Sequence, residues 1–349
     1  LPSKQVYAGL SNSTVVLFGG MFVIGAAMFK TGLAEAIGLW VVHKAGTGEV
    51  KLMGAVMLVT IILSSVSSNT GTVACLMPVI IGIANAAHIP ASKELMPLAV
   101  AANVGGTITM IGTPPNVIVT GALSAAGLPS FGFFEFALIG VPLSIIVLVY
   151  MLTIGRKTIP IKDAGAMDDA AVKAAKEEAG ASDDSAPKSK TKMWISGLIL
   201  IGVVVCMALD LKTVPLQTAA VTGAILCVIT GCLKEKEAYA GIDWVTIFLF
   251  AGMLSVATAM DKTGAGKLIA DTVVSMMGDH PNPIVLCAVL YLISNVLTQF
   301  MSNTASAALL APIGISIAQS IGADPKPVLM AIGIAASMAF ATPMATPPN

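Results

Sequence analysis

The sequence contains the same pair of motifs twice. Ser68-Asn69-Thr70 is followed by Thr113-Pro114-Pro115-Asn116, and Ser302-Asn303-Thr304 is followed by Thr346-Pro347-Pro348-Asn349. The offset from the first SNT tripeptide to the second and the offset from the first TPPN motif to the second differ by a single position. All four motifs lie in long stretches of low charge, so small polar residues and prolines recur in apolar surroundings. This arrangement predicts a binding site built from two related halves.

The composition is typical of a protein that crosses a membrane several times. The chain of 349 residues is 56% hydrophobic and 11% charged, whereas about a quarter of the residues in a soluble domain are charged. Residues 52–92, 95–134 and 280–323 contain no Asp, Glu, Lys or Arg. Each stretch could cross a lipid bilayer about twice, because one crossing helix needs ~20 apolar residues. We therefore predict an all-α polytopic membrane protein.

The composition also argues against several kinds of ligand. The net charge of zero argues against nucleic acid as a partner. The five cysteines lie in or beside apolar segments without CxxC spacing, which is typical of buried small hydrophobic residues. The three histidines lie near segment ends, away from carboxylate pairs. We predict neither a His- or Cys-based metal site nor an organic cofactor.

The first half, residues 1–154, is predicted to contain two interrupted elements. An apolar segment at 14–29 and a shorter interfacial helix at 33–43 lead into a re-entrant hairpin at 52–87. The two runs of this hairpin, about 13 and 16 residues long, are short for a crossing and meet at a polar tip, Ser64–Gly71. Non-helical backbone at membrane depth is tolerated only where protein or a cavity surrounds it.

The next helix, at 95–126, is predicted to be discontinuous. Pro114 and Pro115 lack a backbone donor, and the residue before a proline is driven out of the α region. The helix should therefore break at Gly112–Asn116. A plain span at 136–154 completes this half.

Residues 155–192 differ in kind from the segments around them. They hold eight Lys or Arg, seven Asp or Glu and no aromatic residue, a composition that cannot bury enough apolar surface to become ordered. We predict a disordered linker. The second half, 193–349, then has spans at 193–209 and 217–233, a helix at 244–260, a hairpin at 283–320 and a broken helix at 328–349.

The charges predict that the two halves are inverted repeats. If the linker is cytoplasmic, as the positive-inside rule favours, the helix at 14–29 crosses in the opposite sense to its copy at 244–260. The second half has two spans before its helix at 244–260, whereas the first half has none before the matching helix at 14–29. The first half has a span after its TPPN motif, whereas the second half has none. We therefore expect a longer full-length protein, with at least one more span at each end, in the cell (inner) membrane.

The chemistry of the repeated motifs suits ions. One SNT motif alone is equally well explained as a helix N-cap, but two copies, each followed by a helix break, favour a binding site. Helix N-termini offer N–H groups and partial positive charge to an anion, and unwound backbone offers oxygens to a small hard cation. No Lys or Arg lies at membrane depth. Amides, hydroxyls and bound cations would therefore have to hold the anion.

The carboxylates argue against a proton pump, which more often places one in the middle of a span. They fall near segment ends, and we assign them to solvation at the membrane interface: Glu35, Glu94, Glu135, Asp261, Asp271 and Asp279.

At these motifs the sequence resembles the divalent-anion/sodium symporter (DASS) family of di- and tricarboxylate carriers. The resemblance covers nearly the whole chain, through the two SNT tips, the two TPPN breaks and the spans between them. It implies a homodimeric elevator transporter, in which a domain holding both hairpins and both broken helices moves against a scaffold.

The resemblance also implies residue roles. One sodium site would use Ser64, Ser68, Asn69 and the backbone at Gly112, and the other Thr298, Asn303 and the backbone at Ala345. Thr298 stands where serine is usual in the family and keeps the hydroxyl. The substrate carboxylates would meet Ser68, Asn69, Thr70, Ser302, Asn303 and Thr304, with Thr113, Pro114, Thr346 and Pro347 nearby.

The leading hypothesis is a secondary active transporter of a small divalent anion, a C4-dicarboxylate, coupled to sodium. The alternatives are a cation/proton antiporter or an oxyanion transporter on a related inverted-repeat fold, and a sodium-independent dicarboxylate exchanger. An enzyme would need a nucleophile with a base or a metal cluster inside a span. The sequence offers hydroxyls there without an Asp, Glu or His partner, so we predict that the protein is not an enzyme.

Overall fold

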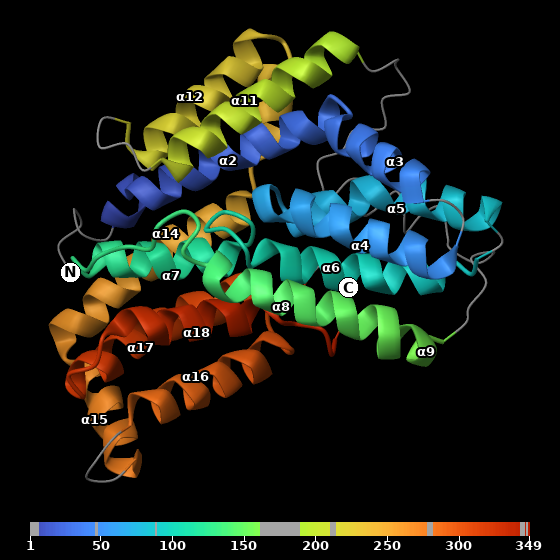
Figure 1. The fold of residues 1–349 in the computed structure, drawn as a ribbon. Helices are drawn as coiled ribbons and strands as arrows, with labels where there is room; N and C mark the ends of the chain where they lie inside the picture. Colours follow the sequence, from blue (N-terminus) through green and yellow to red (C-terminus); the bar gives the residue numbers. More distant parts are fainter. Residues whose placement is uncertain are drawn as a thin grey trace.

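The structure is a computed structural model that describes residues 7–45, 48–87, 89–160, 189–209, 214–277, 282–342, 346 and 348–349. In this part of the chain the secondary structure is helical and contains no strand (Figure 1). The prediction of an all-α protein is therefore confirmed. The predicted roles of Ala345 and Pro347, the middle of the predicted linker (161–188) and Asp279 lie outside the described residues.

The first half contains a 3-10 turn, a run of α-helices and a π-helical turn. Their bounds are η1 Ala8–Ser11, α2 Ser13–Lys30, α3 Leu33–Ala45, α4 Glu49–Val66, α5 Asn69–Ala86, α6 Ser92–Gly106, α7 Pro114–Ala125, α8 Ala137–Tyr150, the π turn η2 Met151–Gly155 and α9 Arg156–Thr158. The last three elements follow each other without a gap, so this span runs into the start of the predicted linker.

The second half follows the predicted order, with two additional helices. Its elements are α11 Lys190–Ala208, α12 Leu216–Ile229, α13 Glu235–Ala240, α14 Trp244–Thr263, α15 Ala265–Met277, α16 Pro283–Thr298, α17 Asn303–Ser320 and α18 Pro325–Ser337. The short helix α13 and the amphipathic helix α15 were not predicted. By length and composition, four of the described helical segments could cross a membrane: Ser13–Lys30, Glu49–Val66, Ala137–Thr158 and Lys190–Ala208.

The first hairpin has longer helices and a narrower tip than the sequence suggested. Helix α4 continues through Ser64 and Ser65, because the Ser65 hydroxyl donates to Ile62 O at 2.8 Å and the Ser64 hydroxyl to Ala102 O at 2.7 Å. With these partners the serines no longer compete with the helix. Helix α4 has 18 residues and is long and apolar enough to cross a membrane, so the expectation that its run is too short was wrong. In α5, the apolar part Asn69–Ala84 remains shorter than a crossing helix.

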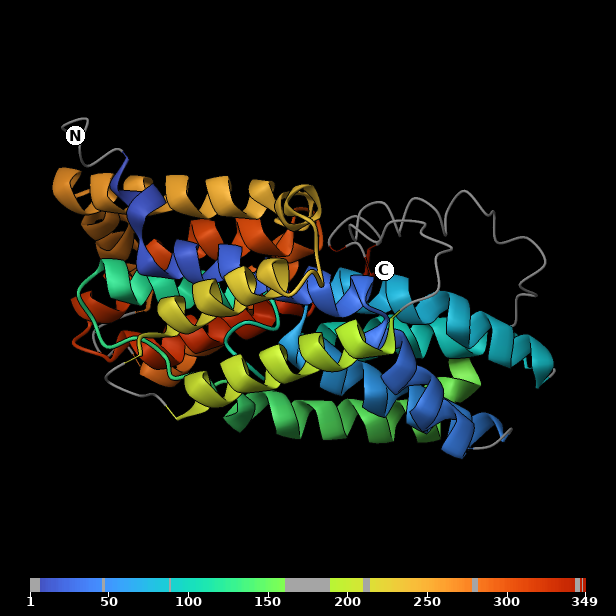
Figure 2. The same ribbon diagram turned by 90° about the horizontal axis from the view of Figure 1, so that it is seen from above.

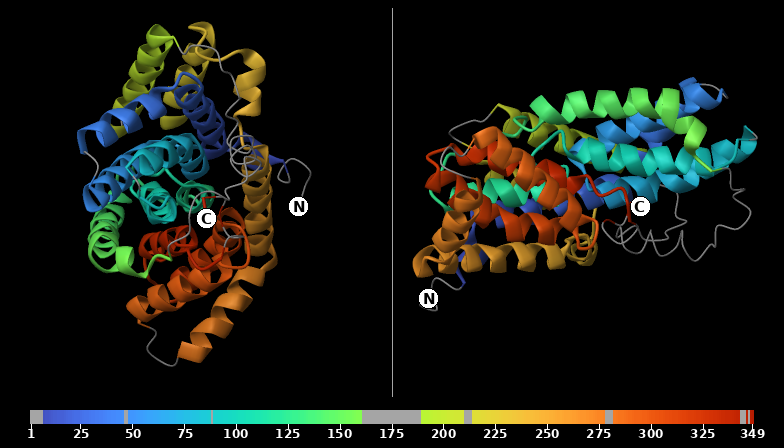
Figure 3. Two further views of the ribbon diagram at one scale, coloured as in Figure 1. Left: turned by 90° about the vertical axis from the view of Figure 1, so that its right-hand side faces the viewer. Right: turned by 90° about the horizontal axis from the view of Figure 1, so that it is seen from below.

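The hairpins and the broken helices pack together as one group. Helix α6 packs on α4 and α5, α18 packs on α16 and α17, and α7 contacts both α17 and α18. Helices α11 and α12 pack on α2, on the far side of the molecule from α16 (Figures 1 and 2). Seen end-on in Figure 3, the teal and red segments that carry the two breaks lie side by side near the centre. The repeated motifs therefore meet in the interior.

Candidate functional site

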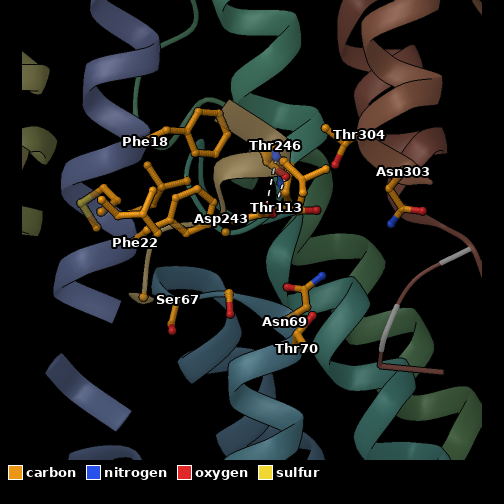
Figure 4. Close-up of a pocket in the computed structure, with 18 of the residues that line it drawn as sticks. Phe18, Phe22, Ser67, Asn69, Thr70, Thr113, Asp243, Thr246, Asn303 and Thr304 are labelled. Atoms are coloured by element: carbon orange, nitrogen blue, oxygen red, sulfur yellow. Dashed lines mark hydrogen bonds between the residues drawn. The ribbon is translucent and has the colours of Figure 1, made fainter. Parts of the chain in front are cut away.

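The two hairpin tips and the two breaks line one cavity of about 540 Å³. Figure 4 shows Asn69 and Thr70 on one side of it, Asn303 and Thr304 on another, and Thr113 between them. Nine of the ten predicted substrate residues line this cavity, namely Ser68, Asn69, Thr70, Thr113, Pro114, Ser302, Asn303, Thr304 and Thr346. The structure thus brings together positions from opposite halves of the sequence.

The serine of each SNT motif caps the helix that follows it. The Ser68 hydroxyl accepts a hydrogen bond from Gly71 N at 3.0 Å, and the Ser302 hydroxyl accepts one from Ala305 N at 3.2 Å. A cap satisfies one first-turn donor, and other first-turn donors have no partner within the helix. Capping and ligand binding are therefore compatible at both tips.

Three oxygen atoms converge at the first tip. The Ser64 hydroxyl donates to Asn69 Oδ1 at 2.6 Å and to Ala102 O in α6 at 2.7 Å. A serine hydroxyl has one proton, so this single proton serves two acceptors. Ser64 is fully buried and Asn69 is 8% exposed. Hydroxyl, amide and carbonyl oxygens thus converge at one point, and such oxygens suit a small hard cation.

The second tip repeats this cluster atom for atom. The Thr298 hydroxyl donates to Asn303 Oδ1 at 2.7 Å and to Ala336 O in α18 at 2.8 Å. Thr298 is also fully buried. Threonine in place of serine leaves the bonding pattern unchanged, because only the hydroxyl takes part. We refer below to the Ser64–Asn69–Ala102 and Thr298–Asn303–Ala336 oxygens as the first and second oxygen clusters.

Gly112, another predicted sodium ligand, lies beside the first oxygen cluster. A Cβ atom on Gly106 would lie 3.0 Å from Gly112 O and would overlap Asn69 Oδ1. The Gly112 carbonyl and the Asn69 amide therefore lie close together over a position where only glycine fits. Ser68, predicted for the same site, lies on the cavity wall as the cap of α5.

The last residue of each TPPN motif braces its own break. Asn116 donates through Nδ2 to Thr109 O at 2.9 Å and to Gly106 O at 3.5 Å. Asn349 donates in the same way to Thr342 O at 3.1 Å and to Ala339 O. Sequence reasoning assigned no role to these asparagines, although their recurrence in both motifs was a visible signal.

The remaining wall of the cavity comes from elements that the sequence did not point to. Phe18, Met21 and Phe22 of α2 and the segment before α14 complete the lining (Figure 4). The rings of Phe18 and Phe22 stack with their centroids 5.5 Å apart. An i, i+4 pair of phenylalanines is typical of ordinary helix packing, so no local signal marked these residues.

The lining contains a single charged residue among those described, and no Lys, Arg or His. That residue is Asp243, which accepts hydrogen bonds from the backbone N–H of Thr246, at 3.0 Å, and from the Thr246 hydroxyl. Both bonds cap the first turn of α14. The described lining therefore offers an anion amides and hydroxyls but no basic side chain, and the prediction that bound cations help to hold it stays a prediction.

One carboxylate departs from its prediction. Glu94 is fully buried, and neither of its carboxylate oxygens has a hydrogen-bond partner among the described residues. The assignment of Glu94 to interfacial solvation was wrong, because the first turn of α6 is covered by neighbouring helices. The adjacent Lys93 pairs with Glu49 at 2.8 Å instead. Glu135, in contrast, forms a partly exposed ion pair with Lys326 at 2.9 Å.

Known proteins match the chain over nearly its whole length. The model of the citrate transporter family (CitMHS) matches residues 1–335. An uncharacterized transporter of Haemophilus influenzae is 31% identical over 373 residues, which cover 99% of this chain and 75% of the relative. The sodium-dependent dicarboxylate transporter SdcS of Staphylococcus saprophyticus is 26% identical over 382 residues, covering 100% of this chain and 72% of the relative.

A solved structure shares the fold. The crystal structure of the Alcanivorax borkumensis YdaH transporter, described as having an unusual topology, superposes with a TM-score of 0.66 at 14% sequence identity and covers 98% of this chain and 78% of that one. At this identity the likeness concerns the fold alone.

Together, these matches and the apolar helices identify an integral membrane transporter rather than an enzyme. The predicted resemblance to di- and tricarboxylate carriers is confirmed by the family model and by the SdcS relative. The chain belongs to the citrate transporter family.

Proposed function

We propose that the protein is a secondary active carrier of a small divalent anion, a C4-dicarboxylate, and that sodium drives the transport. The observation that carries this proposal is the pair of oxygen clusters, which repeat the same bonds at the two tips of one cavity that has no basic side chain among its described lining residues.

The clusters suit sodium because hydroxyl, amide and carbonyl oxygens are the ligands that small hard cations prefer. Ser64, Asn69 and the Gly112 carbonyl would hold one ion, with Ser68 at the cavity side. Thr298 and Asn303 would hold the other, with Ala345 as the predicted backbone ligand. Two cations would offset the charge of a dianion, which explains how an anion can bind without a lysine or arginine.

The anion itself would lie between the tips. A cavity of about 540 Å³ is within the usual range for small-molecule sites. Its polar groups come from two sides of the cavity, with Asn69 and Thr70 from one half of the sequence and Asn303 and Thr304 from the other (Figure 4). A molecule with a carboxylate at each end matches this arrangement. The SdcS relative, a sodium-dependent dicarboxylate transporter, supports the same substrate class.

The packing supports an elevator mechanism. Both hairpins and both broken helices form one packed group, whereas Phe18 and Phe22 of α2 and the start of α14 form the opposite wall of the cavity. Movement of the first group past the second would expose the same site to each side of the membrane in turn. A homodimer in the cell (inner) membrane, with the 155–192 linker in the cytoplasm, belongs to this proposal.

The test is uptake of radiolabelled succinate into proteoliposomes containing the full-length protein, with an inward gradient of sodium or of potassium. We expect sodium-dependent uptake, abolished in Asn69→Ala and in Asn303→Ala. Thr60→Val is the matched control, because Thr60 is fully buried in α4 and its hydroxyl donates to Val56 O of its own helix. It should transport like the wild type.

Other outcomes separate the alternatives. Equal uptake in potassium, together with a requirement for internal dicarboxylate, would indicate the sodium-independent exchanger. If citrate or sulfate inhibits uptake and unlabelled C4-dicarboxylates do not, the substrate is a tricarboxylate or an oxyanion instead. Full activity of both asparagine variants would rule out the assigned site.

A further inference from the structure

A chain of three asparagine side chains connects the two halves behind the cavity. Asn69 donates through Nδ2 to Asn103 Oδ1 at 3.5 Å, and Asn103 donates through Nδ2 to Asn349 Oδ1 at 3.0 Å. Asn349 in turn donates to Thr342 O and Ala339 O in the second break. The chain therefore begins in the first oxygen cluster and ends at the turn that follows the second.

The direction of this chain is set by the chemistry of the amide group. A carboxamide has an acceptor oxygen on one side and a donor nitrogen on the other. When Asn69 turns its oxygen toward Ser64, its nitrogen must face Asn103. The oxygen of Asn103 then faces Asn69, and its nitrogen faces Asn349. Each amide fixes the orientation of the next, and hydrogen bonds linked in this way strengthen one another.

Asn103 lies at a position where an unpaired polar side chain would destabilise the protein. It lies in α6 and is fully buried. Burial of an amide costs free energy unless its donor and its acceptor are both satisfied. The two arms of Asn103 are satisfied by residues from different halves, so its bonds join the halves rather than stabilise α6 locally.

The corresponding residue of the second half makes a different connection. Ser337, which follows Ala336 as Asn103 follows Ala102, donates to Gly333 O within its own helix at 3.0 Å and approaches the Thr113 hydroxyl at 3.5 Å. Each half therefore uses this position to reach the TPPN motif of the other. The one proton of the Ser337 hydroxyl is shared between Gly333 O and Thr113, whereas the carboxamide of Asn103 has a donor arm and an acceptor arm that are fixed relative to each other. Asn103 is therefore the side chain whose orientation is tied to both neighbours.

We propose that Asn103 is a positioning residue that couples the two sodium sites. This inference rests on the proposed function. With an ion bound in the first oxygen cluster, Asn69 Oδ1 would stay turned toward it, and Asn103 and Asn349 would then be held in a single orientation against Thr342 O and Ala339 O. This part of the second break would be fixed before the second ion binds. Ordering by the first ligand lowers the cost of binding the second, so sodium binding is cooperative.

The experiment measures sodium binding directly, apart from transport. The full-length protein in detergent is heated at increasing concentrations of sodium chloride, with choline chloride holding the ionic strength constant. The slope of the gain in stability against the logarithm of the sodium concentration then gives the number of ions bound at each concentration. Succinate uptake against sodium concentration is measured in parallel. We expect a Hill coefficient well above 1 for the wild type in both measurements.

Asn103→Leu, which has a similar shape but no polar arm, should lower the Hill coefficient to about 1 and raise the half-saturating sodium concentration by roughly 5-fold or more, the usual lower range of coupling between sites. Uptake at saturating sodium should be largely kept. Asn103→Ser introduces the residue found at the corresponding position of the second half and should give the same loss of cooperativity. It serves as the test if Asn103→Leu does not fold. Ser337→Ala is the matched control and should remain cooperative.

Two results would overturn the inference while leaving the proposed function in place. One is a Hill coefficient of 1 in the wild type. The other is unchanged cooperativity in a folded Asn103 variant. Absence of any sodium effect on wild-type stability and uptake would instead reject the proposed function, and the coupling with it.

Discussion

The two oxygen clusters have the same bonds but are supported in different ways. At the first, α4 and α6 are in direct backbone contact, since a Cβ atom on Gly105 would lie 2.6 Å from the Cα atom of Ile61. At the second, the position that corresponds to Ile61 is Asn295, which donates to Met338 O at 3.2 Å and to Ala335 O at 3.5 Å. Glycine permits close packing in one half, and a side-chain amide bridges the gap in the other.

The residue at each hairpin tip shows the same contrast. The carbonyl oxygens of Ser65 and Gln299 accept hydrogen bonds from the hydroxyls of Thr109 and Thr342, respectively. The Ser65 hydroxyl donates within its own helix, whereas Gln299 donates to Met338 O at 3.2 Å and accepts from Ala341 N at 2.9 Å. The cluster geometry is therefore common to both halves, but because its supports differ we expect the two halves to tolerate substitution differently.

The largest expected effect is that of Gly106→Ala. Its Cβ atom would overlap Asn69 Oδ1 and crowd Gly112 O, so the first cluster could not form. We expect sodium-driven uptake to fall roughly 100-fold, which corresponds to ~3 kcal/mol and to the size typical of overpacking. The matched change is Ala339→Gly in the second break, which should retain most activity. Similar losses of uptake in Gly106→Ala and Ala339→Gly would contradict the proposed difference in packing between the two clusters.

Loss of the shared hydroxyl should affect the two halves equally. Ser64→Ala and Thr298→Val each remove a fully buried hydroxyl that bonds to an asparagine and to a backbone carbonyl. We expect each to raise the half-saturating sodium concentration about 10-fold, since ~1.4 kcal/mol is a reasonable loss for these bonds. Thr298→Ser keeps the hydroxyl and should behave as the wild type. Sodium titration of uptake distinguishes these outcomes.

Loss of the Gln299 amide should destabilise the protein more than loss of the Ser65 hydroxyl at the corresponding position of the first half. Gln299→Ala deletes the bonds to Met338 and Ala341, and we expect the free energy of unfolding to drop by about 1–3 kcal/mol. Ser65→Ala at the corresponding position should cost less than about 1 kcal/mol, because it removes one bond within a helix. Melting temperatures in detergent compare the two. A larger drop in melting temperature for Ser65→Ala than for Gln299→Ala would contradict the greater role that we assign to the Gln299 side chain.

The smallest expected effect concerns Glu94, in the first turn of α6. Glu94 is buried without a hydrogen-bond partner in the described part of the chain, and the corresponding residue of α18 is Val328, which is also buried. Glu94→Met should raise the free energy of unfolding by about 1 kcal/mol, since it removes an unsatisfied buried polar group of similar volume. Glu135→Gln is the exposed comparison and should lower it by less than about 1 kcal/mol. A less stable Glu94→Met would show that the carboxyl group has a partner or a function.

The sequence alone was sufficient for most of the helices, for the presence of the two breaks and for the polar residues that the two hairpin tips bring to the cavity. Pro114 and Pro115 are the first residues of α7, where a missing backbone N–H costs nothing, whereas α6 has already ended at Gly106, before the predicted break at Gly112–Asn116. Charge-free stretches define buried or membrane-facing helices whatever surrounds them. The repetition of SNT and TPPN then marked the two tips, because a pattern that occurs twice in the same order is visible without coordinates. Helix ends were less well predicted where side chains such as Ser65 bond back to the backbone.

The tertiary structure decided what depends on distant partners. The bond from Ser64 to Ala102, the cavity wall formed by Phe18 and Phe22, and the relay through Asn103 each join segments that no local pattern connects. The burial of Glu94 is of the same kind, because exposure depends on which helix covers a residue. Local sequence thus determined where the chain bends and which groups it offers, and long-range packing decided which of those groups meet.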